Sequence, residues 1–493
     1  MITRKGDIAF IIVGDDKRVQ IPDLGRFRTG AGRLKGLRCI HTHLHRESIS
    51  KEDLADMALL GLDLMASVQI NEEGIPGIIE YAHILPDNHQ KRGWSITSVP
   101  DIGQLDIDFE DFIKSLEDEF TRTGKGKALT KRQKAILASV TTGSAGKARE
   151  SLEELSTLAA SNDLQVVDTV IQNIKKMNPR FLMGRGRLSE LVLKCIQNDA
   201  DLLIFDNELT PAQVKSLTDY TELKIIDRSQ LILDIFSRRA VTREGKIQVE
   251  LAQLKYLLPR LATKNSAMSR LTGGIGGRGP GETKLEINRR RARDRISRLN
   301  SELSRIKKQR KERRRLRNAN RLPVISIVGY TNAGKSTLLN SLTRSHVGTG
   351  NRLFETLDPS SRRLRFPRER EAIITDTVGF IRDLPESLME AFAATLEELH
   401  DADLLLHVVD VSNPRMEDQI KIVNKILAQL NLKGVPTLLV LNKTDLLDDE
   451  YVSILSEKNN GILVSAIDRQ TLFPLFERIE DYLWSPNASV ENL

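Results

Sequence analysis

The residues best suited to chemistry form a glycine-rich loop in the C-terminal half of the chain. The loop has the pattern G-x-x-x-x-G-K-S and consists of Gly329, Tyr330, Thr331, Asn332, Ala333, Gly334, Lys335 and Ser336. The apolar run 322–328 before it predicts a buried strand, and a helix is predicted from Ser336 and Thr337 onward. Backbone N–H groups and the Lys335 ammonium would bind phosphate there, and the Ser336 hydroxyl would ligate Mg²⁺. The loop therefore predicts a nucleotide-binding site.

A second segment, at the end of the strand-like run 373–376, complements this loop. It has the pattern D-x-x-G and consists of Asp376, Thr377, Val378 and Gly379. Asp376 would help to hold Mg²⁺ together with Ser336, and the Gly379 N–H would contact the γ-phosphate. We therefore expect Lys335 and Gly379 to take part in catalysis.

Two further segments determine which base the nucleotide carries. The run 438–441 is followed by Asn442, Lys443 and Asp445 in the pattern N-K-x-D, and the run 461–464 is followed by Ser465 and Ala466. The Asp445 carboxylate can accept hydrogen bonds from the ring N–H and the exocyclic amine of guanine. Adenine has an acceptor at that ring position and no amine beside it. The Ser465–Ala466 turn can offer a backbone N–H to the guanine carbonyl. The four segments in this order predict a GTPase domain that hydrolyses GTP to GDP and phosphate.

The composition is that of a folded protein with several domains. The 493 residues correspond to about three domains of ~150 residues each. Hydrophobic residues make up 40% and charged residues 29%, which argues against a disordered chain. No apolar run is long enough to span a bilayer, and the first residues lack a signal-peptide pattern. Cys39 and Cys195 lie far apart, so no disulfide framework is indicated. We expect a cytoplasmic protein.

The basic character of the chain is concentrated in one segment. Residues 284–321 contain 17 Lys and Arg against four acids, a net charge of +13 in a chain whose total is +7. An apolar residue recurs there every three or four positions, at Ala292, Ile296, Leu299, Leu303 and Ile306. This spacing predicts one apolar seam on a long basic helix. Such a cationic stripe is typical of proteins that bind a phosphate backbone; the alternative is a solvated helix without a partner.

A matching seam precedes the basic helix. It consists of Ile247, Leu251, Leu254, Leu258 and Leu261. The glycine-rich segment 273–281 lies between the two seams, with Arg278 among its glycines. Two compatible seams joined in this way predict an antiparallel helical hairpin with a flexible tip; the alternative is that the segment is only a linker.

Two α/β units are predicted upstream of the hairpin. Strand-like runs at 135–140, 166–167, 201–206 and 223–227 alternate with helical stretches at 148–161, 187–198 and 211–219. This alternation predicts a parallel sheet, and the polar segment 122–127 is the predicted linker to an earlier α/β unit. The predicted fold class is therefore multidomain α/β. The predicted domains are 1–130, 131–236 (α/β lobe), 237–321 (hairpin) and 322–486 (GTPase), with a tail at 487–493.

Several strings between residues 135 and 484 resemble the HflX family of GTPases. They are GRGRL at 184–188, FDNELTPAQ at 205–213, IDR at 226–228, LILDIF at 231–236, TREGK at 242–246, QLKY at 253–256 and GRGPGET at 277–283. The resemblance implies an α/β lobe and a helical hairpin ahead of the GTPase domain. It also implies binding to the large ribosomal subunit, where the hairpin tip reaches toward the peptidyl-transferase centre, and splitting of stalled ribosomes by the GTP-bound protein.

The same resemblance implies roles for residues outside the four nucleotide motifs. Arg278 at the tip, and Arg289, Arg290 and Arg291 on the basic helix, would contact ribosomal RNA. Thr356, in the string FETLDP at 354–359, would close onto Mg²⁺ and the γ-phosphate in the GTP state, as both a catalytic and a metal-binding residue.

Phe380 occupies the position at which many GTPases carry a glutamine that orients the attacking water. A phenyl ring cannot hydrogen-bond to water, so we expect slow intrinsic hydrolysis that the ribosome or a bound cation completes. Asn332 is a candidate K⁺ ligand by similarity to cation-activated GTPases. The alternative is a loop residue that bonds to its own backbone.

The N-terminal unit contains three alternating histidines, His41, His43 and His45, followed by Ser50 and Asp53. The pattern resembles JAMM-type metalloproteins, in which two His and one Asp hold Zn²⁺. However, the spacing from the second histidine to the serine is one residue shorter than in that family, and no Glu precedes the cluster as general acid/base. Alternating side chains of a strand share one face, so a catalytic site, a metal site and a non-catalytic scaffold all stay open.

Three functions are consistent with these features. The first is a monomeric GTPase that binds the large ribosomal subunit and splits or rescues stalled ribosomes. The second is a GTP-regulated assembly scaffold that binds ribosomal RNA. The third is an enzyme in the N-terminal unit that the GTPase domain regulates. In each case we expect a cytoplasmic protein, associated with ribosomes or peripherally with a membrane. ATP binding by the lobe also stays open, although no Walker pattern occurs there.

Overall fold

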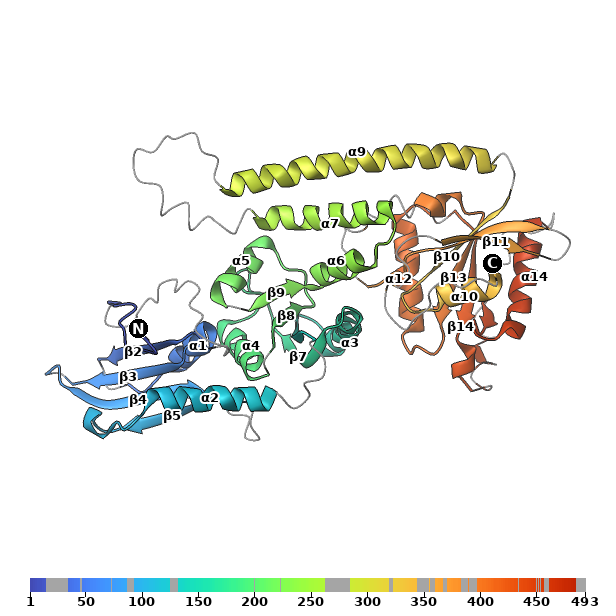
Figure 1. Cartoon of the computed structure of the whole chain (residues 1–493). Helices are drawn as coiled ribbons and strands as arrows, with labels where there is room; N and C mark the ends of the chain where they lie inside the picture. Colours follow the sequence, from blue (N-terminus) through green and yellow to red (C-terminus); the bar gives the residue numbers. More distant parts are fainter. Residues whose placement is uncertain are drawn as a thin grey trace. The chain divides into compact units, whose positions relative to one another are not determined.

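In the computed structural model the chain forms two compact units, Met1–Leu231 and Ile232–Leu493 (Figure 1). The multidomain α/β class that the sequence predicts is confirmed. The structure describes residues 1–14, 34–44, 47–71, 73–86, 93–124, 132–198, 200–221, 223–261, 284–318, 322–343, 354, 360–366, 370–382, 389, 397–432, 434–448, 450, 452, 454–455 and 461–484.

The first unit begins with a five-stranded sheet in the order β1-β2-β3-β4-β5. Its elements are β1 (Ile2–Thr3), β2 (Leu37–His43), α1 (Lys51–Leu60), β3 (Leu64–Ile70), β4 (Pro76–Ile84), β5 (Trp94–Val99), the 3-10 helix η1 (Ile102–Gln104) and α2 (Phe109–Gly124). Strands β2 and β3 are parallel because the helix α1 connects them, whereas the other neighbours pair antiparallel.

The ends of the two helices in this part follow from local sequence. Ser50 is the N-cap of helix α1 and forms a capping box with Asp53, and the C-cap is Gly61 in the left-handed conformation. Helix α2 continues through residue 124. The predicted linker 122–127 is therefore wrong at its start, and its remainder lies outside the described residues.

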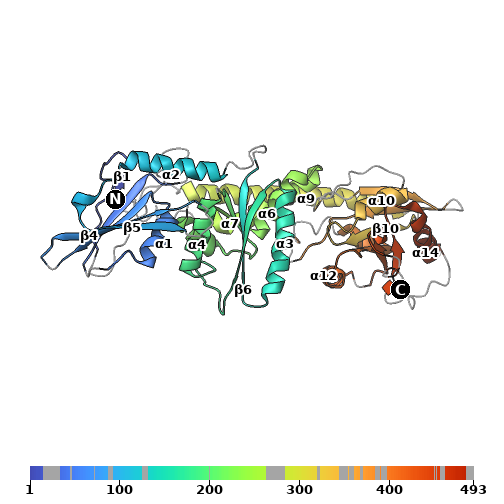
Figure 2. The same ribbon diagram turned by 90° about the horizontal axis from the view of Figure 1, so that it is seen from below.

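A second sheet, with four parallel strands in the order β7-β6-β8-β9, forms the α/β lobe. Its elements are β6 (Lys134–Thr141), α3 (Ala145–Ser161), β7 (Gln165–Asn173), α4 (Arg185–Gln197), β8 (Leu202–Phe205), α5 (Pro211–Tyr220), β9 (Lys224–Asp227) and α6 (Arg228–Arg239). Each predicted strand and helix of this region is present. Helices α3 and α4 lie on opposite faces of the sheet (Figure 2). The connection from β6 to β7 and the connection from β7 to β8 run in opposite directions across the sheet, so two right-handed crossovers must place their helices on opposite faces.

One hydrophobic core joins the two sheets of the first unit. It contains Leu37 and Met65 from the first sheet together with Leu191 from α4 of the lobe. The side-chain amide of Gln197 also donates to the carbonyl oxygen of Leu85, at 2.9 Å. The N-terminal sheet is thus packed on the lobe through shared apolar burial.

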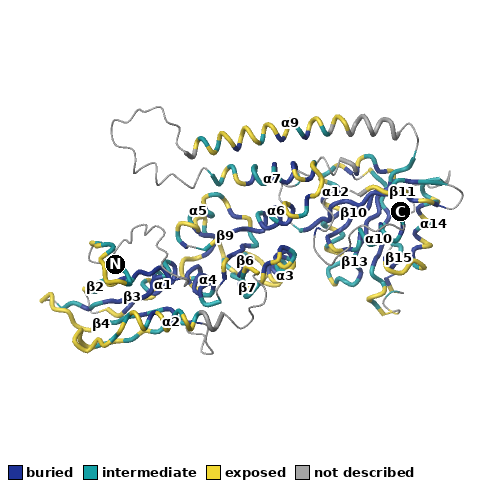
Figure 3. The backbone as a smooth tube through the Cα atoms, viewed as in Figure 1, coloured by how far each residue is buried: buried dark blue, intermediate teal, exposed yellow. Residues whose placement is uncertain are grey.

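Two long helices lie side by side at the start of the second unit, α7 (Arg243–Leu261) and α9 (Lys284–Asn318) (Figure 1). Their shared apolar cluster follows the predicted seams and consists of Ile247, Leu251, Leu254, Ile296, Leu299, Leu303 and Ile306. Arg295 donates to the Glu250 carboxylate at 2.7 and 2.8 Å, and Arg243 pairs with Glu302. Exposed residues recur along α9 in Figure 3. The predicted glycine-rich tip, 273–281, lies outside the described residues.

The C-terminal sheet has six strands in the order β11-β12-β10-β13-β14-β15. Its elements are β10 (Val324–Gly329), α10 (Lys335–Thr343), β11 (Ser360–Arg365), β12 (Glu371–Asp376), η3 (Glu397–Asp401), β13 (Leu404–Asp410), α12 (Met416–Gln429), β14 (Thr437–Asn442), η4 (Thr444–Leu446), β15 (Ile462–Val464), η5 (Arg469–Leu472) and α14 (Phe473–Trp484). All neighbours are parallel except β11, which is antiparallel to β12. The carboxyl ends of β10, β12, β14 and β15 therefore meet at one edge. Among the described residues, no helix combines the length and apolarity that crossing a membrane requires.

Candidate nucleotide-binding site

The predicted phosphate loop leaves β10 and enters α10 at that edge. Both glycines of this loop are required, because a side chain at either position would collide with neighbouring atoms. A Cβ on Gly329 would lie 2.2 Å from the Val408 carbonyl oxygen. A Cβ on Gly334, which has a φ of +91°, would lie 2.3 Å from Nδ2 of Asn442. The loop can therefore turn tightly against β13 and β14 and enter α10 at its N-terminus, where an anion is stabilised.

Lys335 is buried under this loop. Its Nζ donates to the carbonyl oxygens of Gly329 at 3.2 Å and Tyr330 at 2.8 Å. Burial lowers the pKa of Lys335 to about 8, and the nearby Asp376 carboxylate partly opposes that shift. A Cβ on Gly379 would lie 2.9 Å from Nζ of Lys335. Lys335 and Gly379, two of the three residues predicted for catalysis, thus lie against each other.

Ser336 and Asp376 form the predicted metal-binding pair. The Ser336 hydroxyl donates to Oδ2 of Asp376 at 2.6 Å, and Asp376 is fully buried. Adjacent oxygens around Mg²⁺, each about 2.1 Å from the ion, lie roughly 3 Å apart, so this pair fits two neighbouring coordination positions after a small outward shift. Thr377 donates through Oγ1 to the Ile327 carbonyl at 2.6 Å and so helps to close the strand end. Thr356 lies outside the described residues.

Backbone bonds hold the D-x-x-G segment against the phosphate loop. The N–H of Thr331 donates to the Phe380 carbonyl at 2.8 Å, and the N–H of Phe380 donates to the Gly329 carbonyl at 3.1 Å. The Tyr330 hydroxyl accepts from the Arg382 N–H at 2.8 Å. The Phe380 ring is buried in the interior. Its side chain therefore packs in the core, whereas the expectation from the sequence rested on its lack of a polar group to orient water.

The base-reading segments are bonded to the phosphate loop and to each other. Nδ2 of Asn442 donates to the Ala333 carbonyl at 2.8 Å, and its Oδ1 accepts from the Ala466 N–H at 2.9 Å. The Ser465 hydroxyl donates to Oδ1 of Asp445 at 2.6 Å, and its N–H donates to Oγ1 of Thr471 at 2.8 Å. Both N–H groups of the Ser465–Ala466 turn thus have partners, so the expected donation to guanine would require one of these bonds to be exchanged.

Sequence reasoning missed two residues that support the site. Asp410, at the end of β13, accepts from Nζ of Lys443 at 2.6 Å. The signal for Asp410 was its place at the end of an apolar strand, as for Asp376. Phe354 is buried, and its ring packs on Phe236 of α6 with centroids 4.6 Å apart. No local pattern could have indicated this pair, because its members are far apart in the sequence.

Three family models match consecutive parts of the chain. Residues 149–237 match the N-terminal region of GTP-binding GTPases, residues 239–317 match their middle region, and residues 324–443 match a 50S ribosome-binding GTPase. The chain is 47% identical over 362 residues to GTPase HflX of Caldanaerobacter subterraneus subsp. tengcongensis. The aligned region covers 73% of this chain and 83% of the relative. It is 44% identical over 340 residues to GTPase HflX of Escherichia coli K12, which covers 68% and 80%.

This chain belongs to the HflX family. It is therefore a GTP-binding protein and a GTPase. Among solved structures, this HflX chain is similar to a GTP-binding protein from the archaeon Sulfolobus solfataricus in complex with GDP. The identity is 26%, the match covers 71% of this chain and 98% of the other, and the TM-score is 0.38.

The HflX-like strings of the lobe make contacts within the lobe. Arg228 is buried and pairs with Asp206 at 2.8 Å and with Glu154. The side chain of Asn207 bonds both the N–H and the carbonyl of Val140, each at 2.8 Å. These polar groups therefore bond to other residues of the lobe and stabilise the carboxyl-terminal edge of its sheet.

The arginines predicted to contact RNA lie near the start of α9. Arg290 and Arg291 are exposed and Arg289 is half-buried. Further exposed basic residues follow along the helix, at Arg293, Arg298, Arg305 and Lys308. Arg278 lies outside the described residues. The apolar seam is turned to α7, so these cations occupy the other faces of the helix.

Proposed function

We propose that this HflX protein binds the large ribosomal subunit in its GTP state and splits or rescues stalled ribosomes. The observation that carries this proposal is the direct continuity of the basic helix with the nucleotide site. Helix α9 ends at Asn318, and β10, which leads into the phosphate loop, begins at Val324. The match to 50S ribosome-binding GTPases supports the ribosome as the partner.

The exposed side of α9 supplies the electrostatic part of this function. Arg290, Arg291 and Arg293 follow one another near the tip end, and basic side chains recur at Arg298 and Arg305. Phosphate groups of ribosomal RNA would take the place of the counterions around these cations, so binding should weaken steeply with salt. The apolar seam packs α9 on α7, which leaves these basic side chains on the exposed faces of the helix.

A packing contact supplies a route from nucleotide to hairpin. Phe354 begins the segment whose Thr356 is expected to close onto Mg²⁺ and the γ-phosphate. The Phe354 ring rests on Phe236 of α6, and the chain passes from α6 to α7 within a few residues. Closure of this segment on GTP would therefore act on the base of the hairpin as well as on the phosphate site.

The nucleotide chemistry follows from the site. The loop N–H groups and Lys335 would bind the phosphates, Ser336, Asp376 and Thr356 would hold Mg²⁺, and Asn442, Lys443, Asp445, Ser465 and Ala466 would surround guanine. Bound Mg²⁺ would neutralise charge on the phosphates. No polar side chain at position 380 can orient the water, so hydrolysis would be slow alone.

We propose Asn332 as a K⁺ ligand that assists hydrolysis. It has an exposed side chain and a left-handed backbone, φ 62°. Hydrolysis compared in K⁺ and Na⁺ for the wild type and Asn332→Ala tests this role. Equal rates in both salts for the wild type would remove K⁺ from the proposal.

A sucrose gradient tests the main proposal. Purified whole ribosomes are mixed with the protein and GTP or a non-hydrolysable analogue, and free subunits are quantified. We expect splitting by the wild type, and none by a variant whose residues 273–281 are replaced with a Gly-Ser linker, although that variant still binds the large subunit. Lys335→Ala is the control for nucleotide dependence. Binding to immature ribosomal RNA without splitting would instead support an assembly scaffold.

A further inference from the structure

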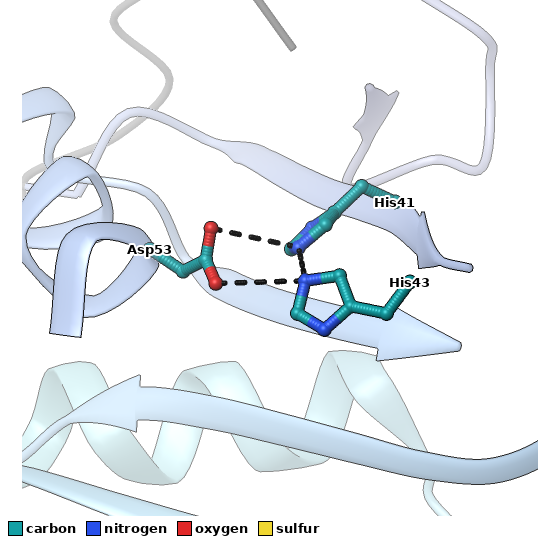
Figure 4. Close-up of side chains that lie close together, drawn as sticks. All are labelled: His41, His43 and Asp53. Carbon is teal, nitrogen blue, oxygen red and sulfur yellow. Dashed lines mark hydrogen bonds and ion pairs between the residues drawn. The ribbon is translucent and has the colours of Figure 1, made fainter. Parts of the chain in front are cut away.

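A cluster of metal-ligand side chains lies in the first unit and shares no residue with the nucleotide site. His41 and His43 occupy alternate positions of β2, so both face the first turn of α1, where Asp53 lies (Figure 4). The Nε2 atoms of the two imidazoles are 2.8 Å apart. Oδ1 of Asp53 is 3.6 Å from Nε2 of His41, and Oδ2 is 3.6 Å from Nε2 of His43. His45 lies outside the described residues.

We propose that His41, His43 and Asp53 together bind one Zn²⁺ ion or a similar divalent transition metal ion. Zn²⁺ bonds to imidazole nitrogen and carboxylate oxygen are about 2.0–2.1 Å long, so tetrahedral donors lie roughly 3.3 Å apart. The separations of 2.8 and 3.6 Å in the structure lie on either side of that value. Small side-chain rotations would therefore complete the geometry. Two imidazoles favour such an ion over Ca²⁺ or Mg²⁺, which prefer oxygen ligands.

Outer hydrogen bonds hold two of the three ligands, His43 and Asp53, in the state that a metal requires. Nδ1 of His43 lies 2.7 Å from the Glu47 carbonyl, which can only accept, so Nδ1 carries the proton. In the neutral ring, Nε2 then presents its lone pair to the cluster. The N–H and the hydroxyl of Ser50 donate to Oδ2 of Asp53 at 2.8 and 2.7 Å, which fixes the carboxylate. Its Oδ1 takes no part in these bonds and faces His41.

The cluster is accessible to an ion from solvent. The side chains of His41, His43 and Asp53 are 13%, 14% and 24% exposed. The described part of the chain offers three ligands there. A tetrahedral ion would thus keep one position for water, as catalytic zinc sites do. The ion would also tie the end of β2 to the start of α1 and so stabilise the first unit.

The test is Zn²⁺ binding by the full-length chain. Protein stripped with a chelator is titrated with Zn²⁺ by calorimetry in excess Mg²⁺, and Co²⁺ is used in parallel to detect tetrahedral coordination by its visible absorption. We expect one tight Zn²⁺ per chain. Asp53→Asn and His43→Ala should weaken binding by more than about 100-fold, since losing an outer partner alone costs about 10–100-fold. Ser50→Ala, which removes such a partner, should fall in that smaller range.

A neighbouring acid on the same helix turn supplies the matched control. Glu52 is exposed and stands one residue before Asp53. Glu52→Gln removes the same charge as Asp53→Asn and should leave Zn²⁺ affinity unchanged. Thermal unfolding and GTP binding of each variant verify that the chain is folded. Zn²⁺ affinity that is equal in the wild type and Asp53→Asn, or no Zn²⁺ bound by the folded wild type, would overturn the proposal and leave a hydrogen-bonded histidine pair.

Discussion

Replacement of Asp445 by asparagine should change which nucleotide the protein binds. In the proposed complex, the carboxylate of Asp445 accepts two hydrogen bonds, from the ring N–H and the exocyclic amine of guanine. An amide keeps one acceptor and turns a donor toward the other guanine donor. Xanthine has a carbonyl in place of that amine, so Asp445→Asn should bind xanthosine triphosphate.

The size of the effect follows from the two lost bonds. A hydrogen bond to a charged group contributes about 1.5–3 kcal/mol, so the pair contributes about 3–6 kcal/mol. At about 1.4 kcal/mol per factor of ten, the Kd for GTP should rise by about 10²–10⁴-fold. Ser465 gives a graded comparison, because its hydroxyl only orients the carboxylate, with 2.6 Å between Oγ and Oδ1 of Asp445. Ser465→Ala should cost about 1 kcal/mol, or roughly fivefold.

The assay is displacement of a fluorescent guanine nucleotide, with GTP, xanthosine triphosphate and ATP as competitors. Asp448→Asn serves as the control, because it removes an exposed carboxylate from the same loop without touching the proposed base site. Undiminished GTP affinity in Asp445→Asn would refute the assignment of 442–445 as the base-reading segment. Equal losses in Asp445→Asn and Asp448→Asn would show a general charge effect.

Three other expectations concern the phosphate site and the hairpin. Burial lowers the pKa of Lys335 to about 8, and bound phosphate would raise that pKa again. Above pH 8, GTP binding should therefore be accompanied by uptake of one proton, and the Kd for GTP should rise by up to about tenfold per pH unit. Calorimetry in buffers of different ionisation enthalpy would detect that proton, and its absence would contradict the role of Lys335. Phe354→Ala, which removes the ring contact with Phe236, should leave GTP affinity nearly unchanged but reduce the difference in ribosome affinity between the GTP and GDP states. A full GTP–GDP difference in that variant would exclude this route of coupling. Charge reversal of Arg290 and Arg291 should weaken binding to the large subunit and make its salt dependence shallower, while basal hydrolysis is unchanged, as co-sedimentation over a range of salt concentrations would show.

Local patterns were sufficient for the nucleotide motifs and the helical seams. A phosphate loop needs a strand, a glycine turn and a helix start in immediate succession, so the segment 329–336 could be recognised from adjacent residues. The apolar seams on α7 and α9 follow from helical periodicity alone, and the cluster around Leu251 and Leu299 lies where that periodicity predicts. The four lobe strands could also be predicted from local sequence, because each is a short apolar run between turn signals.

Tertiary structure decided what joins these elements, because such contacts depend on pairings between distant parts of the chain. Asn442 was predicted only as part of a base-reading motif, yet its amide bonds Ala333 in the phosphate loop. The burial of Phe380 depends on how its strand end packs, which no spacing encodes. The histidine pattern by itself left three readings open. Strands β2 and β3 pair in parallel, and α1 connects them. This crossover places the first turn of α1, which contains Asp53, beside His41 and His43.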